Sequence, residues 1–260
     1  MKIAGRILFC IMFLLSGGLG SLPAQEYAGI TGMIHVPTAE MAPEGEARIG
    51  VFFLNGNFLP DKMLYEHEKY HTSNHFLAIT PFPWIELSYV CTLMKGESST
   101  GKVGYNMKDR HFAVKVRPLK EGKWWPAIAI GAQDPGRTVP DNGDYAYFQN
   151  FYLTASKHFA WKRHEWAVHL AYRYYRSDFN RKWRGIAGGI TYRPSFAKNL
   201  RAMVEYTGED INIGVDCLLW KHLFLQASLQ DGKHFTGGAC FKINLLGNKK
   251  QARKERKSNL

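Results

Sequence analysis

Short segments in which apolar and polar residues alternate recur along this chain, and residues 166–174 show the pattern most clearly. In an extended strand, one face of this segment would carry Trp166, Val168, Leu170, Tyr172 and Tyr174, and the other Ala167, His169, Ala171 and Arg173. Side chains of a strand point alternately to its two faces. Repeated around a closed sheet, large apolar groups on one face and small or basic groups on the other are typical of a barrel with lipid outside and a polar lumen inside.

The alternation predicts about twelve strands, near residues 46–55, 73–81, 84–93, 109–117, 126–133, 148–158, 163–174, 183–192, 199–206, 210–218, 222–230 and 234–244. Most are close to the roughly nine to eleven residues that a tilted strand needs to cross a bilayer. An even number of strands leaves both ends of the barrel wall on one side. We therefore predict an all-β fold, an antiparallel transmembrane β-barrel of about 12 strands.

The connections support this interpretation because short and long ones alternate. Short turns are expected at residues 81–83, 159–162 and 219–221, and long loops at 56–72, 94–108 and 134–147. Asp231-Gly232 predicts a tight hairpin among the later loops. Five of the seven tryptophans (Trp84, Trp124, Trp125, Trp161 and Trp220) fall at the predicted periplasmic turns, as expected of a membrane interface. A soluble β-sandwich with tryptophans in its core is the alternative.

The two ends of the chain lie outside the predicted barrel. Residues 1–24 read as a signal peptide, with Lys2 and Arg6 before a short apolar stretch. Cys10 lies within that stretch rather than after it, so no lipid attachment is expected. Residues 25–45 are predicted to be an N-terminal periplasmic or plug segment, because Pro37, Pro43 and Gly45 favour a rigid, turn-rich path. We predict that residues 46–246 form the barrel and that residues 247–260 form a basic, disordered tail.

Charge and cysteine content exclude some classes of protein. The formal net charge is +12, of which the signal contributes +2 and the tail +5, leaving +5 for the body. So mildly basic a body does not indicate nucleic-acid binding. The mature chain has three cysteines, Cys91, Cys217 and Cys240, and an odd number spread over separate strands argues against a disulfide framework.

The lumen face of the predicted strands carries the candidate site. Its charged members are Arg48, Glu86, Lys115, Arg117, Arg173, Arg201, Glu205 and Asp216. These groups would either pair with one another and fill the interior, or line a narrow wet channel. Pairing of Glu205 and Asp216 with Arg201 or Arg173 is expected. The surplus of basic over acidic groups leaves room for an anionic partner.

Three stretches carry a resemblance to a known family. They are residues 32–45 (GMIHVPTAEMAPEG), residues 126–134 (PAIAIGAQD, with Lys115 upstream and Ala155-Ser156-Lys157 downstream), and residues 205–215 (EYTGEDINIGV). Together they resemble the YjbH family, outer-membrane proteins associated with exopolysaccharide and group 4 capsule production. The resemblance implies a barrel that serves polysaccharide secretion or assembly at the bacterial outer membrane. It supplies no catalytic residues.

Histidines raise two enzymatic alternatives. Residues 67–71 read His-Glu-Lys-Tyr-His and match the zinc-protease motif, which requires a stable helix. Here the motif falls in a polar loop without a helical apolar face, so we expect neither a catalytic zinc nor another cofactor, although adventitious metal binding is an alternative. His71, Ser73 and His75 near the outer rim are the candidates for a lipid- or glycan-modifying hydrolase.

The sequence therefore predicts a non-enzymatic outer-membrane barrel that supports export or assembly of an exopolysaccharide or capsule. Its expected partners are outer-membrane lipid, an anionic polysaccharide and periplasmic export components. The alternatives are a passive channel or structural barrel without a polysaccharide role, and the barrel hydrolase.

Overall fold

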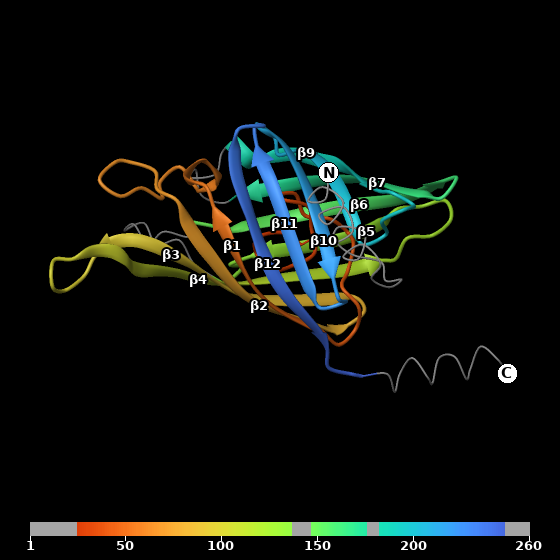
Figure 1. The fold of residues 1–260 in the computed structure, drawn as a ribbon, viewed down its shortest axis with the longest axis horizontal. Helices are drawn as coiled ribbons and strands as arrows, with labels where there is room; N and C mark the ends of the chain where they lie inside the picture. The colour runs from red at the N-terminus through yellow and green to blue at the C-terminus, as the bar shows by residue number, and fades with distance from the viewer. Residues whose placement is uncertain (1–24, 137–146, 176–181, 248–260) are drawn as a thin grey trace, which may run out of the picture.

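The protein is a single closed barrel in the computed structural model, which describes residues 25–136, 147–175 and 182–247 (Figure 1). The strands are β1 (Glu46–Leu54), β2 (Thr72–Phe82), β3 (Ile85–Glu97), β4 (Val103–Leu119), β5 (Ala127–Gln133), β6 (Asn150–Trp161), β7 (His164–Tyr175), β8 (Gly185–Arg193), β9 (Leu200–Tyr206), β10 (Ile211–Leu219), β11 (Leu223–Gln230) and β12 (His234–Asn244). The predicted signal peptide and all but the first residue of the predicted tail lie outside the described residues.

Each strand pairs antiparallel with its neighbours in sequence, and β1 pairs with β12 to close the sheet. At this seam Arg48 lies opposite Lys242, and Phe53 opposite Gly237. Closure leaves no strand with an unpaired edge, so the backbone groups of the wall bond within it. The predicted all-β antiparallel barrel of about 12 strands is confirmed.

The two faces of the wall differ as the alternation requires. Along β7, Trp166, Val168 and Leu170 are exposed on the outer face, whereas His169 and Arg173 are buried inside. The other strands repeat this pattern of exposure, so the outer face is largely apolar, whereas the inner face combines polar side chains with buried apolar ones such as Phe52, Phe76 and Phe224. Among the described residues, no helix is long and apolar enough to cross a membrane.

The two ends of the barrel are unlike. One end, which we call the terminal end, holds the start of β1, the end of β12 and mostly tight turns; the other, the loop end, carries the longest connections. The Asp231-Gly232 turn at the loop end has φ of 49° and 65°, a left-handed pair that suits a two-residue hairpin. The five tryptophans predicted at one interface all lie in turns or strand ends at the terminal end.

One predicted loop is wrong. Residues 94–108 form the outer part of a long hairpin rather than a loop, in which Met94 pairs with Met107 and Glu97 with Val103. The turn occupies only residues 98–102, where Gly101 takes a φ of 77°. The Gly- and Ser-rich composition of the tip indicated a loop, but the ladder of β3 and β4 continues almost to the turn.

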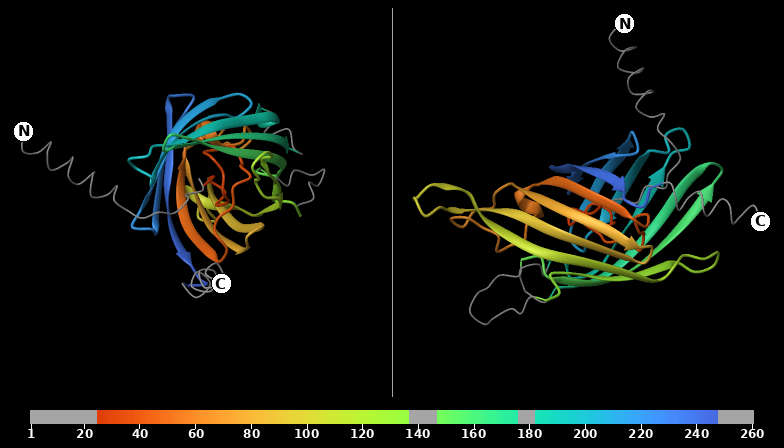
Figure 2. Two further views of the ribbon diagram at one scale, coloured as in Figure 1. Left: turned by 90° about the vertical axis from the view of Figure 1, so that its right-hand side faces the viewer. Right: turned by 90° about the horizontal axis from the view of Figure 1, so that it is seen from below.

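The N-terminal segment, residues 25–45, lies largely inside the barrel. Figure 2 (left) looks along the barrel and places this orange-red segment within the ring of strands. Every residue from 25 to 39 is buried. We call this segment the plug; of the two predicted placements, the structure has the one inside the lumen.

A charge on the outer face tests whether this face meets lipid. Leu170→Lys should destabilise the barrel in lipid vesicles by about 2–4 kcal/mol if the site lies near the bilayer midplane. If the outer face met water instead of lipid, the same substitution at this exposed position should change the free energy of unfolding by no more than about 0.5 kcal/mol. Urea titration of the vesicle-folded protein measures the difference, with Leu170→Ala as the control. Equal stability of the two variants in vesicles would contradict a lipid-facing wall.

Candidate functional site

The plug makes few hydrogen bonds to itself, so its polar backbone depends on the wall. Within it, the recorded turns are closed by the N–H groups of Glu26, Gly29 and Met33, and the isolated bridges join Gln25 with Thr31 and Gly32 with Pro37. Buried N–H and C=O groups without partners are costly. The lumen-facing side chains of the barrel therefore determine where the plug lies.

Glu86 of β3 anchors the first turn of the plug. Its carboxylate accepts hydrogen bonds from the Thr31 backbone nitrogen at 2.8 Å, the Thr31 hydroxyl at 3.0 Å and the Ala42 nitrogen at 2.5 Å. Arg48 and Lys115 lie 3.6 Å and 3.4 Å from the same carboxylate. Two cations and several N–H and O–H donors compensate for its removal from water.

Lys115 of β4 complements this anchor. Its Nζ donates to the carbonyl oxygens of Thr31 at 2.8 Å, Thr38 at 3.3 Å and Glu40 at 2.6 Å, and also to the Thr31 hydroxyl. One ammonium thus joins two stretches of the plug that are separated in sequence, and together with Glu86 it fixes the chain as a loop.

Glu205 of β9 holds the second turn of the plug. Its carboxylate accepts the backbone N–H groups of Ile34 at 3.0 Å, His35 at 2.8 Å and Val36 at 3.1 Å, and the side-chain amide of Asn212 at 2.8 Å. Consecutive N–H groups that converge on one carboxylate form an anion-binding turn. Here the anion is supplied by the wall.

The predicted partner of Glu205 is wrong, since no Glu205 ion pair with Arg201 or Arg173 is present among the contacts of the described residues. The plug occupies the carboxylate instead. Arg173 donates to the carbonyl oxygen of His35 at 3.1 Å and to its Nδ1 at 2.7 Å, and also to the Thr207 carbonyl. Asp216 does pair with Arg201, at 2.6 Å.

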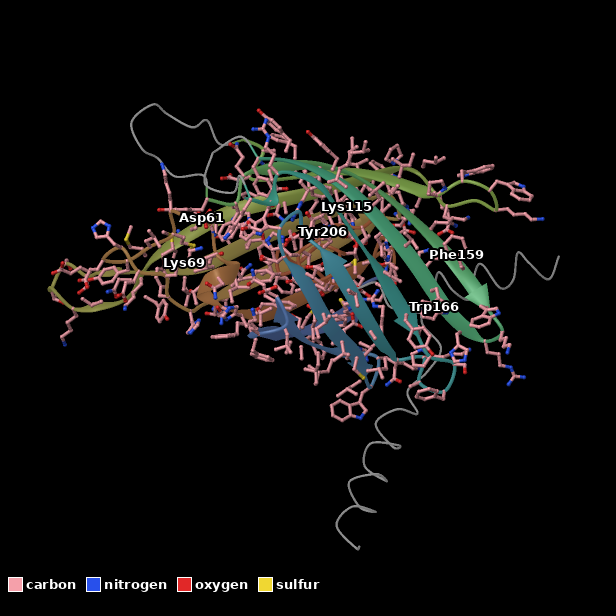
Figure 3. The ribbon with its side chains drawn as sticks, turned by 90° about the horizontal axis from the view of Figure 1, so that it is seen from above. Asp61, Lys69, Lys115, Phe159, Trp166 and Tyr206 are labelled. Carbon is pink, nitrogen blue, oxygen red and sulfur yellow. The ribbon has the colours of Figure 1, made fainter. Side chains whose placement is uncertain are left out.

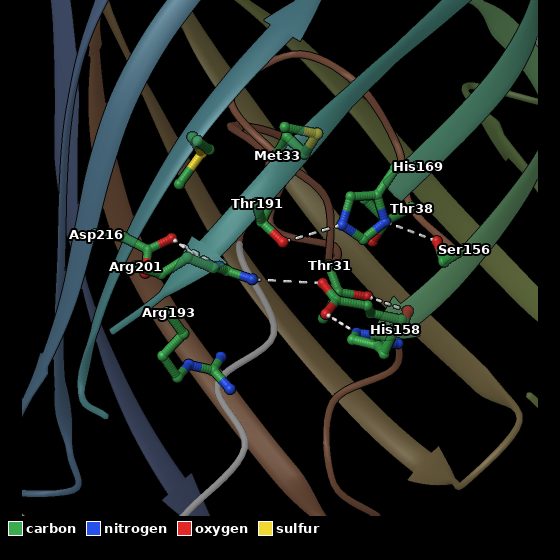
Figure 4. A network of polar contacts seen from close by, with 12 residues as sticks. Thr31, Met33, Thr38, Ser156, His158, His169, Thr191, Arg193, Arg201 and Asp216 are labelled. Carbon is green, nitrogen blue, oxygen red and sulfur yellow. Dashed lines mark hydrogen bonds and ion pairs between the residues drawn. The ribbon is translucent and has the colours of Figure 1, made fainter. Parts of the chain in front are cut away.

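Toward the terminal end, a polar network ties the plug to three parts of the wall (Figure 4). Arg201, already paired with Asp216, lies 3.5 Å from the carboxylate of Glu40. The other Glu40 oxygen lies 3.1 Å from Nε2 of His158, whose Nδ1 is 2.6 Å from Glu121 in the β4–β5 turn. Burial alone would raise the pKa of Glu121, but hydrogen bonds from His158 lower it below its ordinary value.

A serine–histidine pair lies beside this network. His169 contacts the Ser156 hydroxyl through Nδ1 at 2.8 Å and Thr191 through Nε2 at 3.3 Å. The Ser156 oxygen also accepts the Ala39 backbone N–H at 2.9 Å. The plug therefore covers this serine, and the pair serves to bind the plug rather than to present a nucleophile.

A second element closes the lumen at the loop end. The β1–β2 loop, with its short 3₁₀ helix η1 (Gly56–Phe58), buries Phe58, Leu59 and Met63. The Phe58 ring lies 5.8 Å from Tyr27 and 4.8 Å from His35, ring centre to ring centre. Sequence reasoning missed this cap, although three large apolar residues in a predicted outer loop were a signal for burial.

Asp61 makes one salt bridge within the cap and one to the connection before β8. Asp61 of the β1–β2 loop lies 3.0 Å from Lys69 and 2.9 Å from Lys182, which precedes β8 on a distant part of the barrel wall. Figure 3 places Asp61 beside Lys69, at the end of the barrel opposite Phe159. Burial raises the pKa of Asp61, but the two ammonium groups outweigh it and hold the pKa below its ordinary value.

The eight predicted lumen residues divide into two groups. Seven of them are buried inside the barrel and contact the plug or one another: Arg48, Glu86, Lys115, Arg173, Arg201, Glu205 and Asp216. Arg117 is half-buried at the terminal end, where it donates to the Pro83 carbonyl at 2.9 Å.

The zinc-protease motif does not form a helix. Glu66 and His67 take φ of 50° and 67°, and Tyr65 and Glu68 exchange backbone hydrogen bonds at 3.0 Å. In the described part of the chain, no cluster of three or more His, Cys, Asp or Glu side chains is arranged to hold a metal ion.

The rim candidates for a hydrolase separate. The Ser73 hydroxyl lies 3.1 Å from Nε2 of His75 on the outer face of β2. His71 instead accepts the backbone N–H of Gly56 through Nδ1, at 3.1 Å.

The wall is a closed antiparallel sheet with an apolar exterior, and its lumen is filled by the plug. These features define the class of protein as a plugged β-barrel. The model of the YjbH family, described as "Exopolysaccharide biosynthesis protein YbjH", matches residues 24–259, and the chain belongs to this family. A relative from Escherichia coli strain K12, "Uncharacterized lipoprotein YjbH", is 30% identical over 166 residues, which cover 62% of this chain. The chain spans about a fifth (20%) of that relative's length.

Two solved structures are similar at a lower level. The outer membrane phospholipase A of Escherichia coli has a TM-score of 0.36 and 11% identity, covering 77% of this chain and 95% of that one. The calcium-bound outer membrane phospholipase dimer of Salmonella typhi has a TM-score of 0.35 and 11% identity, covering 76% and 89%. Similarity this low says nothing about the chemistry of this chain.

Removal of the Glu205 anchor should loosen the plug. Glu205→Ala leaves three plug N–H groups without their acceptor, at about 1–3 kcal/mol for each group that stays buried. We expect planar bilayers with this variant to show conductance that the intact protein lacks. Glu205→Gln keeps one acceptor oxygen, so its conductance should lie between that of the intact protein and that of Glu205→Ala. Glu97→Ala, an exposed control, should have the same conductance as the intact protein. If Glu205→Ala has the same conductance as the intact protein, Glu205 does not hold the plug.

Proposed function

We propose that this chain is a non-enzymatic barrel of the bacterial outer membrane that supports export or assembly of an extracellular polysaccharide. The observation that carries the proposal is the family match over residues 24–259, combined with a closed barrel whose outer face is apolar. A lipid-facing apolar wall around a polar interior is the arrangement that bacterial outer-membrane barrels share.

The two ends suggest how the barrel is oriented. Trp124, Trp161 and Trp220 are highly exposed at the terminal end, where indole rings suit a membrane interface. Lys123 and Lys162 lie 5.2 Å and 5.4 Å from the Trp124 and Trp161 ring centres, respectively. Paired aromatic and basic groups favour contact with phospholipid headgroups. We place this end toward the periplasm and the loop end toward the exterior, with outer-membrane lipid as the surrounding partner.

The filled lumen bears on how such a barrel could act. The buried basic side chains of the lumen already have partners. Lys115 and Arg173 donate to carbonyl oxygens of the plug, while Arg48 lies beside Glu86 and Arg201 pairs with Asp216. They are poor candidates for binding an anionic polysaccharide while the plug is in place. A freely open passive channel is therefore the weaker alternative. The barrel would act either after plug displacement or as a scaffold that periplasmic export components engage.

A barrel hydrolase is kept as a second candidate by one observation, the Ser73–His75 contact of 3.1 Å on the outer face. A nucleophilic serine needs a neighbouring base that is itself oriented by a third group. The hydrolase requires activity on a lipid or glycan that disappears in Ser73→Ala and in His75→Ala. Activity that survives both substitutions, or is absent from the intact protein, removes this candidate.

Deletion and complementation in a polymer-producing strain test the main proposal. Loss of the chain should abolish or reduce surface polysaccharide, and the intact gene should restore it. The protein should be in the outer-membrane fraction and migrate differently on a denaturing gel before and after heating. Complementation by Ser73→Ala should equal that by the intact chain. A polysaccharide profile unaffected by deletion would overturn the polysaccharide role, and a soluble protein without the gel shift would overturn the barrel.

A further inference from the structure

One carboxyl of the plug is enclosed without a cation beside it. Glu26 is 3% exposed, and among the described residues its side chain has one hydrogen bond, accepted from Nε2 of Gln133 on β5 at 3.2 Å. No ion pair of the described residues includes it, whereas Glu86 lies beside two cations and Glu205 accepts three backbone N–H groups. A buried carboxylate with a single amide donor is poorly compensated for its removal from water.

Both members of this contact have an acceptor atom without a donor. Glu26 Oε2 and Gln133 Oε1 are each buried without a hydrogen-bond partner. An ionised carboxyl only accepts hydrogen bonds, whereas a protonated one also has an O–H donor. A proton on Glu26 would therefore supply the donor that the Gln133 oxygen lacks, so that acid and amide each donate one hydrogen bond to the other. The ionised pair would leave both acceptors unmet.

Two cations act on Glu26 from a distance, and both are bound to other groups. Lys115 of β4 donates to carbonyl oxygens of the plug, and Arg173 of β7 donates to the His35 carbonyl. Glu205 of β9 adds a like charge. Burial outweighs the attraction of the two cations and raises the pKa of Glu26 to about 8. The other titratable groups that interact electrostatically with this carboxyl are the phenols of Tyr27, Tyr152 on β6 and Tyr175 on β7.

We propose that Glu26 is a proton-dependent switch of the plug, which is held in the lumen with this carboxyl protonated and paired with Gln133, and which leaves the lumen as the anion. Docking of the plug takes up one proton from water, and release returns that proton to water. The switch controls how the lumen opens, and it does not depend on which solute passes or on a role in polysaccharide export.

The direction of the pH effect follows from the two environments of the carboxyl. In water its ordinary pKa is 4.5, and in the docked plug the pKa is about 8. The contribution of Glu26 to docking is therefore fully present below about pH 4.5, falls as the pH rises and is lost above about pH 8. Between these values each pH unit shifts the equilibrium about tenfold toward release, because one proton is given up. His35 and Glu40 also change surroundings on release, so their titration must be separated from that of Glu26.

Single-channel recording in planar bilayers tests the switch, with the full chain and with Glu26→Gln. Glutamine resembles the protonated carboxyl in shape and stays neutral, so its plug should not respond to pH through position 26. The ratio of open to closed time is measured for both proteins, and the value for the intact protein is divided by that for Glu26→Gln at the same pH. This quotient should rise about tenfold per pH unit between about pH 5 and pH 8 and then level off. The division cancels every titration that the two proteins share, including those of His35, Glu40 and His158.

Infrared difference spectroscopy gives a second readout. The intact protein should show a protonated-carboxyl band at about pH 6 that Glu26→Gln lacks, and this band should disappear near pH 8. If Glu26→Gln does not fold, Glu26→Ala replaces it, because it also lacks the titratable group.

Glu97→Gln is the matched control, because it neutralises an exposed carboxylate outside the plug. It should equal the intact protein in both measurements, and the gel shift on heating verifies that each variant folds. If the intact barrel stays closed at every pH, the series is repeated with Glu205→Ala, which loosens the plug, with and without Glu26→Gln. A barrel closed in both backgrounds, a quotient that does not change with pH, or identical infrared spectra of the intact protein and Glu26→Gln overturns the proposal. No polysaccharide is present in either measurement, so failure here leaves the proposed function standing.

Discussion

The structure depends on how the wall satisfies the backbone of a segment that it encloses. Inside the barrel the plug is removed from water, and it has too few internal hydrogen bonds to satisfy its own N–H and C=O groups. Glu86 and Glu205 take its N–H groups, while Lys115 and Arg173 take its carbonyl oxygens. Barrel and plug are therefore complementary polar surfaces, and neither interior nor plug would be stable in this form without the other.

This complementarity explains a lumen that looks basic in sequence. Cations outnumber anions among the predicted lumen residues because two of the cations, Lys115 and Arg173, donate to plug carbonyl oxygens, which carry no formal charge, and Arg201 also meets the plug carboxylate of Glu40. Lys115 alone donates to three such carbonyls. A count of charged side chains therefore overestimates the attraction of such a lumen for an anionic solute, since backbone dipoles do not appear in the count.

Alternation along the strands was enough to predict the barrel, its strand number and which face each of the lumen residues occupies, because a period of two directly encodes the two faces of a closed sheet. The partners of those residues could not be predicted. Glu205 binds backbone N–H groups that any residue except proline could supply, so Ile34 and Val36 carry no side-chain signal for the contact. The cap at Phe58 depends on ring contacts with Tyr27 and His35 that are made only in three dimensions.

Closure at both ends constrains how the lumen could ever open. From the loop end, Phe58 of the cap lies against Tyr27 and His35 of the plug, so movement of the plug requires the cap to give up these ring contacts. Lys182, which precedes β8, also ties the cap to another part of the barrel through its ion pair with Asp61. Opening the lumen from the loop end therefore requires that the Phe58 ring contacts and the Asp61–Lys182 ion pair part together, because both join this one loop to the rest of the molecule.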